Sequence, residues 1–193
     1  DHLRIQMFAS GLELEDLWTA IDELDTALES AVEYAFSEKY GYLTACPTNV
    51  GTGMRVSVLM HLPALVVTGE IQRALRSLLA TQFTVRGFYG EGTQAVGDLY
   101  QISNQTTLGV KEEELVEAIT DIVTMIAQYE RRIREMILKG RRVEMEDFAW
   151  RSYGLLCHAR TINSEETLKL LSKVRLGVNM GIISGLSVAQ LNE

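Results

Sequence analysis

A cysteine and an arginine at the two ends of a polar loop carry the strongest chemical signal in this sequence. Cys46 begins the run Cys-Pro-Thr-Asn-Val-Gly-Thr-Gly-Met-Arg, which ends at Arg55. Glycines and hydroxyl residues make this segment a loop rich in backbone N–H donors. Such donors stabilise a thiolate and lower the pKa of the thiol. A thiolate at Cys46 could serve as a nucleophile or as the anionic partner of a guanidinium cation, and the residues themselves leave both open.

Three arginines form a second group. Arg4, Arg55 and Arg86 each lie in or at the end of an expected strand. One such arginine is ordinarily a surface residue whose stem packs along a sheet. Three of them, two beside glycine-rich loops, favour convergence on a polyanion, because the guanidinium fork suits phosphate oxygens and stays charged. Clustered cations are a natural solution to phosphoryl transfer, which depends on positioning and charge stabilisation.

A carboxylate between two glycines is the third feature. Glu91 follows Arg86 in the run Arg-Gly-Phe-Tyr-Gly-Glu-Gly. Glycines on both sides let the backbone approach a ligand closely. A solvated turn glutamate is the ordinary interpretation. The functional one is a carboxylate that grips a guanidinium and aligns it for attack.

Several other classes of protein are disfavoured. The sequence contains no P-loop, no nucleophile elbow and no zinc-ligand spacing, so no protein-held metal is expected. A Cys–His protease is a weak alternative, because His61 lies in an expected strand and the other histidines are distant. The net charge of −8 argues against direct nucleic-acid binding. No apolar run is long enough for a membrane, and Cys46 and Cys157 are interpreted as thiols of a reducing, cytoplasmic compartment.

The elements that must position these residues are mixed in the first half of the chain and helical in the second. Hydrophobic patterning predicts strands over 2–9, 54–62, 83–86 and 98–103. It predicts helices over 13–37, 68–80 (with Thr68 as N-cap), 111–139, 144–161 and 164–179, the last with Ser164 as its cap. This order indicates an α+β fold, an antiparallel sheet flanked by helices, with the sheet and active-site loops in 1–110 and a mainly helical part in 111–193. Basic residues at the end of the long helix, Arg131, Arg132, Arg134, Lys139, Arg141 and Arg142, are expected to stay solvated.

Four segments, in order and spacing, resemble the phosphagen (ATP:guanidino) kinases. Residues 1–4 are similar to the tail of the motif N-E-E-D-H-L-R, and residues 46–55 resemble C-P-[ST]-N-[LV]-G-T-x-x-R. Residues 86–91 resemble R-G-x-x-G-E, and residues 100–104 resemble a strand that ends in Ile-Ser-Asn. Residues 90–92, 101–109 and 148–154 look most like the bacterial protein-arginine kinases, and the creatine and arginine kinases fit these stretches less well.

The resemblance implies a catalytic domain with a glutamine-synthetase-like antiparallel sheet. It implies the reaction of ATP, with Mg²⁺, and protein arginine to ADP and phosphoarginine. Arg4, Arg55 and Arg86 would contact the nucleotide phosphates. The residues that would hold and orient the substrate guanidinium are Cys46, Thr48, Asn49 and Glu91, of which Cys46 and Glu91 would be catalytic and Glu91 would share the role of base.

The resemblance also implies a place in the bacterial stress response. Relatives of this kind phosphorylate proteins with exposed arginines and mark them for a Clp-type protease. Expected partners are a zinc-binding activator protein, a Clp-type ATPase and a heat-shock repressor, and a homodimer is conceivable.

Departures from the family pattern bear on activity. Leu59 stands where small-molecule relatives often carry a histidine, which is compatible with the bacterial branch. The family's other catalytic glutamate would stand immediately before Asp1, and neither it nor the earlier arginines of the phosphate clamp are in this sequence. We therefore expect the chain to be a fragment that is inactive alone while its parent chain is active. Two alternatives stay open, a small-molecule guanidino kinase and a non-catalytic module that binds nucleotide or phosphoarginine.

Overall fold

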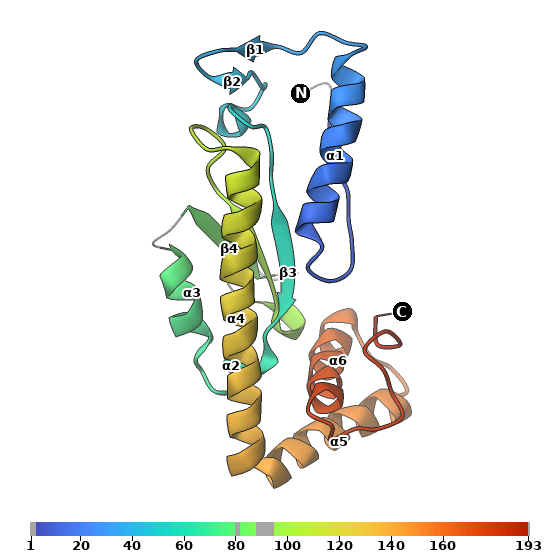
Figure 1. The fold of residues 1–193 in the computed structure, drawn as a ribbon. Helices are drawn as coiled ribbons and strands as arrows, with labels where there is room; N and C mark the ends of the chain where they lie inside the picture. Colours follow the sequence, from blue (N-terminus) through green and yellow to red (C-terminus); the bar gives the residue numbers. More distant parts are fainter. Residues whose placement is uncertain (1–2, 80–81, 88–94, 193) are drawn as a thin grey trace. The chain divides into compact units, whose positions relative to one another are not determined.

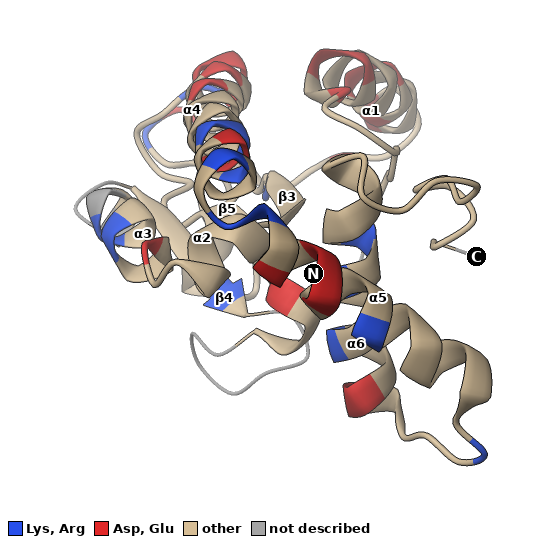
Figure 2. Cartoon of the chain, turned by 90° about the horizontal axis from the view of Figure 1, so that it is seen from below, with Lys and Arg blue, Asp and Glu red and all other residues tan. Residues whose placement is uncertain are grey.

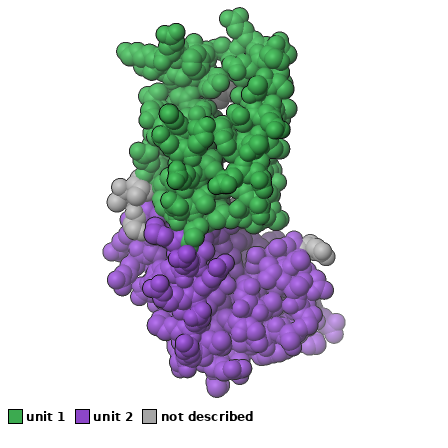
Figure 3. Space-filling model, viewed as in Figure 1, with its two compact units in different colours: residues 1–58, 81–84, 102–124 green, residues 59–80, 85–101, 125–193 purple. Residues whose placement is uncertain are grey.

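The computed structural model describes residues 3–79, 82–87 and 95–192. The chain divides into two compact units, shown in Figure 3. Unit 1 comprises residues 1–58, 81–84 and 102–124, and unit 2 comprises residues 59–80, 85–101 and 125–193. None of the described helices is both long and apolar enough to cross a membrane.

A three-stranded sheet is built from β3 (Ser57–His61), β4 (Phe83–Gly87) and β5 (Leu99–Asn104), in the order β3-β5-β4. Backbone hydrogen bonds join Asn104 to Val56 and Leu62 to Asp98, so β5 runs antiparallel to β3. A bond from Gln105 to Gln82 likewise sets β5 antiparallel to β4. The expected α+β fold with an antiparallel sheet is confirmed. The central strand β5 is the most buried, with Tyr100, Ile102, Ser103 and Asn104 all buried.

Unit 1 also contains α1 (Leu14–Glu29), the strand pair β1 (Phe36–Ser37) and β2 (Gly41–Tyr42), and the short 3₁₀ helix η1 (Pro47–Asn49). Figure 1 shows the pair β1–β2, and η1 follows it along the chain after residues 43–46. These two strands are antiparallel, with Phe36 opposite Tyr42. The helix α4 (Glu112–Gly140) carries both acidic and basic residues along its length (Figure 2).

Unit 2 contains α2 (Pro63–Val67), α3 (Ile71–Leu79), the 3₁₀ turn η2 (Val96–Asp98), α5 (Arg142–His158) and α6 (Ser164–Asn179). The helices α5 and α6 pack side by side around Ala149, Val174 and Ile183 (Figure 1). The cap of α6 is Asn163 rather than Ser164, since the Asn163 side chain accepts the N–H of Glu166 at 2.9 Å.

Two expectations for the first forty residues are wrong. Residues 3–9 form no strand, and Leu3, Met7 and Phe8 are exposed. A strand needs a neighbour for its backbone groups, and alternation alone does not supply one. The expected helix over 13–37 ends at Glu29, where Ser30 donates its hydroxyl to the carbonyl of Ala27 and so competes with continuation.

Two further expectations fail in unit 2. Thr68 ends α2 instead of beginning a helix, and its hydroxyl donates to the carbonyl of Ala64 at 2.8 Å. Arg134 is not solvated, because its Nε donates at 2.8 Å to Glu130, whose side chain is only 3% exposed. Glu130 also accepts the N–H groups of Ala64 and Leu65, at 3.0 Å each, and thereby satisfies the first turn of α2.

Candidate active site

Cys46 lies immediately before η1, where Pro47 takes the first helical position. The cysteine is exposed, and its Sγ is 3.0 Å from the hydroxyl oxygen of Thr48. That hydroxyl, followed by the backbone N–H of the same threonine, lowers the pKa of the Cys46 thiol. Asn49 donates its N–H to the carbonyl of Cys46 at 3.0 Å, which closes the turn. The loop therefore presents a thiol biased toward thiolate.

The cysteine loop is held by residues far away in the sequence. Gly51 pairs with Tyr42, and the next N–H, of Thr52, donates to the carbonyl of Thr107 at 2.9 Å. A Cβ on Gly51 would lie 2.2 Å from that carbonyl oxygen, and the φ of +112° also requires glycine. The hydroxyl of Thr107 is shared between the carbonyls of Thr48, at 3.0 Å, and Val50, at 2.8 Å.

Asn104 fixes the other end of the loop. This residue is 5% exposed, and its Oδ1 accepts the N–H of Val56 at 2.8 Å. Its Nδ2 donates to the carbonyls of Met54 and Thr106, at 3.1 and 3.0 Å. Asn104 thus aligns the segment around Arg55 with the end of β5. Sequence reasoning noticed the Ile-Ser-Asn strand end and the following Gln-Thr-Thr, but assigned neither Asn104 nor Thr107 a role.

Arg55 is exposed but anchored. Its Nη2 donates to the hydroxyl of the buried Ser103 at 3.0 Å. Within the described ranges, the other guanidinium N–H groups have no protein partner. Arg55 therefore combines a defined position with donors directed at solvent, which is the condition that anion binding needs.

The remaining predicted site residues are less well defined. Arg4 is exposed and lies outside any helix or strand, and Arg86 is exposed in β4. Arg4, Arg55 and Cys46 belong to unit 1, whereas Arg86 belongs to unit 2. Glu91 lies outside the described residues. The structure thus gathers Cys46, Thr48 and Asn49 in one turn, and convergence of the three arginines stays a prediction.

No group of three or more histidine, cysteine, aspartate or glutamate residues comes together in the described part of the chain.

Comparison with models of known protein families assigns the chain to a family. Residues 1–133 match the model of the ATP:guanido phosphotransferase C-terminal catalytic domain, and residues 142–193 match that of the protein-arginine kinase McsB C-terminal domain. Because the first match covers well over half of the chain, the protein belongs to the ATP:guanido phosphotransferase family.

Relatives named protein-arginine kinase are similar over nearly the whole chain. The protein of Caldanaerobacter subterraneus subsp. tengcongensis is 50% identical over 184 residues, which are 95% of this chain and 55% of the relative. Those of Halothermothrix orenii and Bacillus subtilis are each 49% identical over 193 residues, or 100% of this chain and 55% and 53% of the relatives. The chain thus spans about half the length of the curated relatives it matches.

Solved structures of small-molecule guanidino kinases share the fold. A lombricine kinase is 32% identical with a TM-score of 0.50, covering 63% of this chain and 33% of its own. The substrate-free duplicated taurocyamine kinase from Schistosoma mansoni is 28% identical with a TM-score of 0.50, covering 61% of this chain and 15% of its own. The expected family and fold are confirmed.

Proposed function

We propose that this chain is the central and C-terminal catalytic part of a protein-arginine kinase, which transfers the γ-phosphoryl group of ATP to arginine side chains of proteins. The observation that carries this proposal is the identity of about half of all residues with proteins of that name over 95–100% of the chain. The match of residues 142–193 to the McsB domain also favours a protein substrate.

The cysteine loop supplies the acceptor side of the reaction. The Cys46 thiolate, stabilised by Thr48, would attract the guanidinium of the incoming arginine. One guanidinium nitrogen attacks the γ-phosphorus, the bond from that phosphorus to the β–γ bridging oxygen breaks, and ADP leaves with the electron pair. The attacking nitrogen loses a proton, for which Glu91 is the proposed acceptor. Two anionic groups would thus orient one cation for attack.

Arginines supply the donor side. Arg55, held by Ser103, would contact the phosphate oxygens, together with Arg4 and Arg86. Their positive charges would offset the negative charge of the phosphoryl group in transfer. Mg²⁺ would be bound together with the nucleotide phosphates, as is usual in phosphoryl transfer. In that role it would neutralise phosphate charge.

The partners and the localisation follow from the same proposal. The partners would be protein substrates with exposed arginines, a zinc-binding activator, a Clp-type ATPase and a heat-shock repressor. The protein would act in the cytoplasm, in the stress response. A small-molecule guanidino kinase is the second candidate, favoured by the fold shared with lombricine kinase.

A chimera provides the test, with the 193 residues replacing the segment they match in the Bacillus subtilis relative. Incubated with Mg-ATP and an arginine-rich unfolded protein, it should form acid-labile, hydroxylamine-resistant phosphate on arginine. The same chimera carrying Glu91→Gln should give only background label. Label on free arginine but not on protein would establish the second candidate instead. Nucleotide binding without label on either would leave a non-catalytic binding module.

A further inference from the structure

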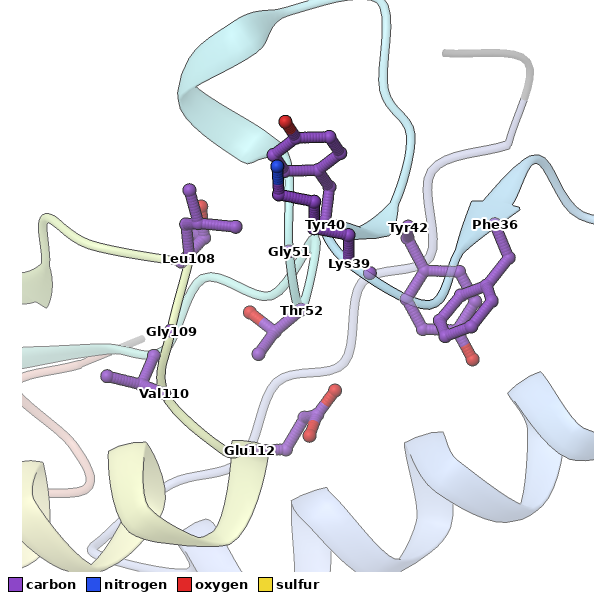
Figure 4. A pocket seen from close by; sticks show the side chains of 12 residues that line it. Phe36, Lys39, Tyr40, Tyr42, Gly51, Thr52, Leu108, Gly109, Val110 and Glu112 are labelled. Carbon is purple, nitrogen blue, oxygen red and sulfur yellow. The ribbon is translucent and has the colours of Figure 1, made fainter.

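Beside the cysteine loop, unit 1 contains a pocket of about 220 Å³ that the proposed reaction does not use (Figure 4). It is bounded by the β1–β2 pair, by the loop at Gly51 and Thr52, and by the segment that leads into α4. This volume is below the roughly 300 Å³ at which pockets for drug-sized ligands begin. Its size therefore suits a single side chain.

One carboxylate faces this pocket. Glu112 is half-buried, whereas Glu113 and Glu114 on the same turn are exposed, and Figure 4 shows its carboxylate directed toward Thr52. Glu114 already caps the N-terminus of α4, because its Oε2 accepts the N–H of Lys111 at 3.3 Å. In the described part of the chain, Glu112 has no hydrogen-bond or ion-pair partner. Its charge is therefore available to a ligand.

Aromatic rings form the rim. Phe36 and Tyr42 pack edge to face with centroids 5.2 Å apart, and Tyr40 is 46% exposed. The Nζ of Lys39 lies 5.0 Å from the centroid of Tyr40, so one ring of the rim already receives a cation of this chain.

Several carboxylates act on Tyr42 at the rim. Burial raises the pKa of Tyr42, and carboxylates raise it further, in the order Glu29, Asp25, Glu112 and Asp22. A pocket of aromatic faces and an unpaired carboxylate complements a cationic side chain that also has an apolar stem, which describes lysine and arginine.

We propose that this pocket is a substrate subsite that binds a lysine or arginine side chain close in sequence to the arginine that is phosphorylated. The inference rests on the proposed function, because Gly51 and Thr52 line the pocket and belong to the loop that carries Cys46. Glu112 attracts the flanking cation, and the rings of Phe36 and Tyr42 contact its stem, while the Tyr40 ring stays with Lys39. The subsite thus gives the kinase a preference for basic sequences.

Peptide binding tests the subsite apart from catalysis. A fluorescein-labelled nonapeptide of glycine and serine around a central arginine is compared with nonapeptides that carry one lysine, placed at each flanking position in turn. Anisotropy titrations use the 193-residue chain and its variants Glu112→Gln and Glu113→Gln, which make the same charge change one residue apart. Circular dichroism checks that each variant is folded.

The lysine peptide should bind more tightly than the neutral one at one flanking position or more. Glu112→Gln should weaken its binding about three- to tenfold, and Glu113→Gln by less than about twofold. Equal losses in both variants, or no gain from lysine at any position, would overturn the subsite.

Labelling of the same peptides by the chimera separates the two proposals. If the peptides bind through Glu112 but neither they nor the arginine-rich protein are phosphorylated, the kinase is refuted and the pocket remains only as a site that binds cationic side chains. Phosphorylation of the neutral and lysine peptides at equal rates, unaffected by Glu112→Gln, would refute the subsite and keep the kinase.

Discussion

At the scale of single residues, the reactive character of the site comes from one short contact. Cys46 is exposed, and its contacts with Thr48 outweigh the small effect of burial, which raises the pKa of its thiol. The lowered pKa of this thiol arises first from the hydroxyl of Thr48 at 3.0 Å. Because the contact spans only two residues, a side-chain substitution can remove it without disturbing the distant contacts of Asn104 and Thr107.

Removing the Thr48 hydroxyl should slow the reaction of the Cys46 thiol with alkylating reagents at neutral pH. Thr48→Val keeps the shape of the side chain but cannot stabilise the thiolate, so the pKa of Cys46 should rise. Alkylation by iodoacetamide, followed over pH in a Cys157→Ser background, should show its midpoint move upward and its rate at neutral pH fall. Thr48→Ser should restore the original profile. Identical profiles for all three proteins would assign the low pKa to something other than this hydroxyl.

A half-buried histidine, His61, gives a second prediction at this scale. Ser172 donates to Asp98, so its oxygen accepts from Nε2 of His61 at 2.8 Å. Nδ1 of His61 then carries no proton, and it has no partner among the described residues. Burial, followed by the charges of Arg175 and Arg134, lowers the pKa of His61 to about 3.

The sign of the pH dependence follows from this shift. The unfolded chain takes up a proton near the ordinary histidine pKa of 6.5, and the folded chain does not until about pH 3. Below pH 6.5 the histidine should therefore cost up to ~1.4 kcal/mol of stability per pH unit. In the parent chain the urea concentration at the unfolding midpoint should fall between pH 7.5 and 5. In His61→Gln this fall should be smaller. In His158→Gln, at an exposed histidine, it should be unchanged, and equal slopes for both variants would contradict this assignment.

At the scale of elements, two glycines within helices allow the effect of helix–helix packing on stability to be separated from the effect of helix propensity. Gly177 on α6 faces α5, where an added Cβ would lie 2.7 Å from the Cβ of Ala149. Gly154 on α5 has nothing within 4 Å of the corresponding position. The close approach of α5 and α6 therefore depends on Gly177 and not on Gly154.

The two alanine variants should change stability in opposite directions. Gly154→Ala should stabilise the protein by about 0.5–1 kcal/mol, because alanine loses less backbone entropy in a helix. Gly177→Ala gains the same propensity but overpacks the α5–α6 contact, so it should destabilise by about 1–2 kcal/mol net. Urea unfolding by circular dichroism measures both. A stabilising Gly177→Ala would show that the helices can separate freely.

At the scale of the whole chain, the 193 residues together carry a net charge of −8. Such a charge disfavours acidic partners and favours basic ones through long-range attraction. On the proposed function, this attraction acts on protein substrates that carry many arginines and much less on a single amino acid.

Added salt should therefore weaken the binding of the protein substrate and leave the rate of phosphoryl transfer nearly unchanged. In the chimera, KM for an arginine-rich protein should rise about threefold or more between roughly 0.05 and 0.3 M NaCl, because screening shortens the range of attraction. The kcat should stay within about twofold. Steady-state labelling at several salt concentrations measures both constants. A fall in kcat with unchanged KM would place the salt effect at the reacting groups instead.

Local patterns were sufficient for much of this protein. The periodicity of residues 111–139 and 164–179 predicted α4 and α6 within one residue, since helical hydrogen bonds close within four residues. The loop from Cys46 to Arg55 and the strand ending at Asn104 indicated the family, because such motifs are contiguous. The proximity of Thr48 to Cys46 likewise lies within one turn.

Only the tertiary structure decided the features that depend on distant partners. Residues 3–9 alternate like a strand but pair with none, and Arg134 looks like a surface cation until Glu130 is seen to hold both it and the start of α2. The roles of Asn104 and Thr107 rest on contacts that span about fifty residues of chain. Sequence alone determined the family and the reactive loop. The fold determined what holds that loop, because a hydrogen bond needs a partner that local spacing does not specify.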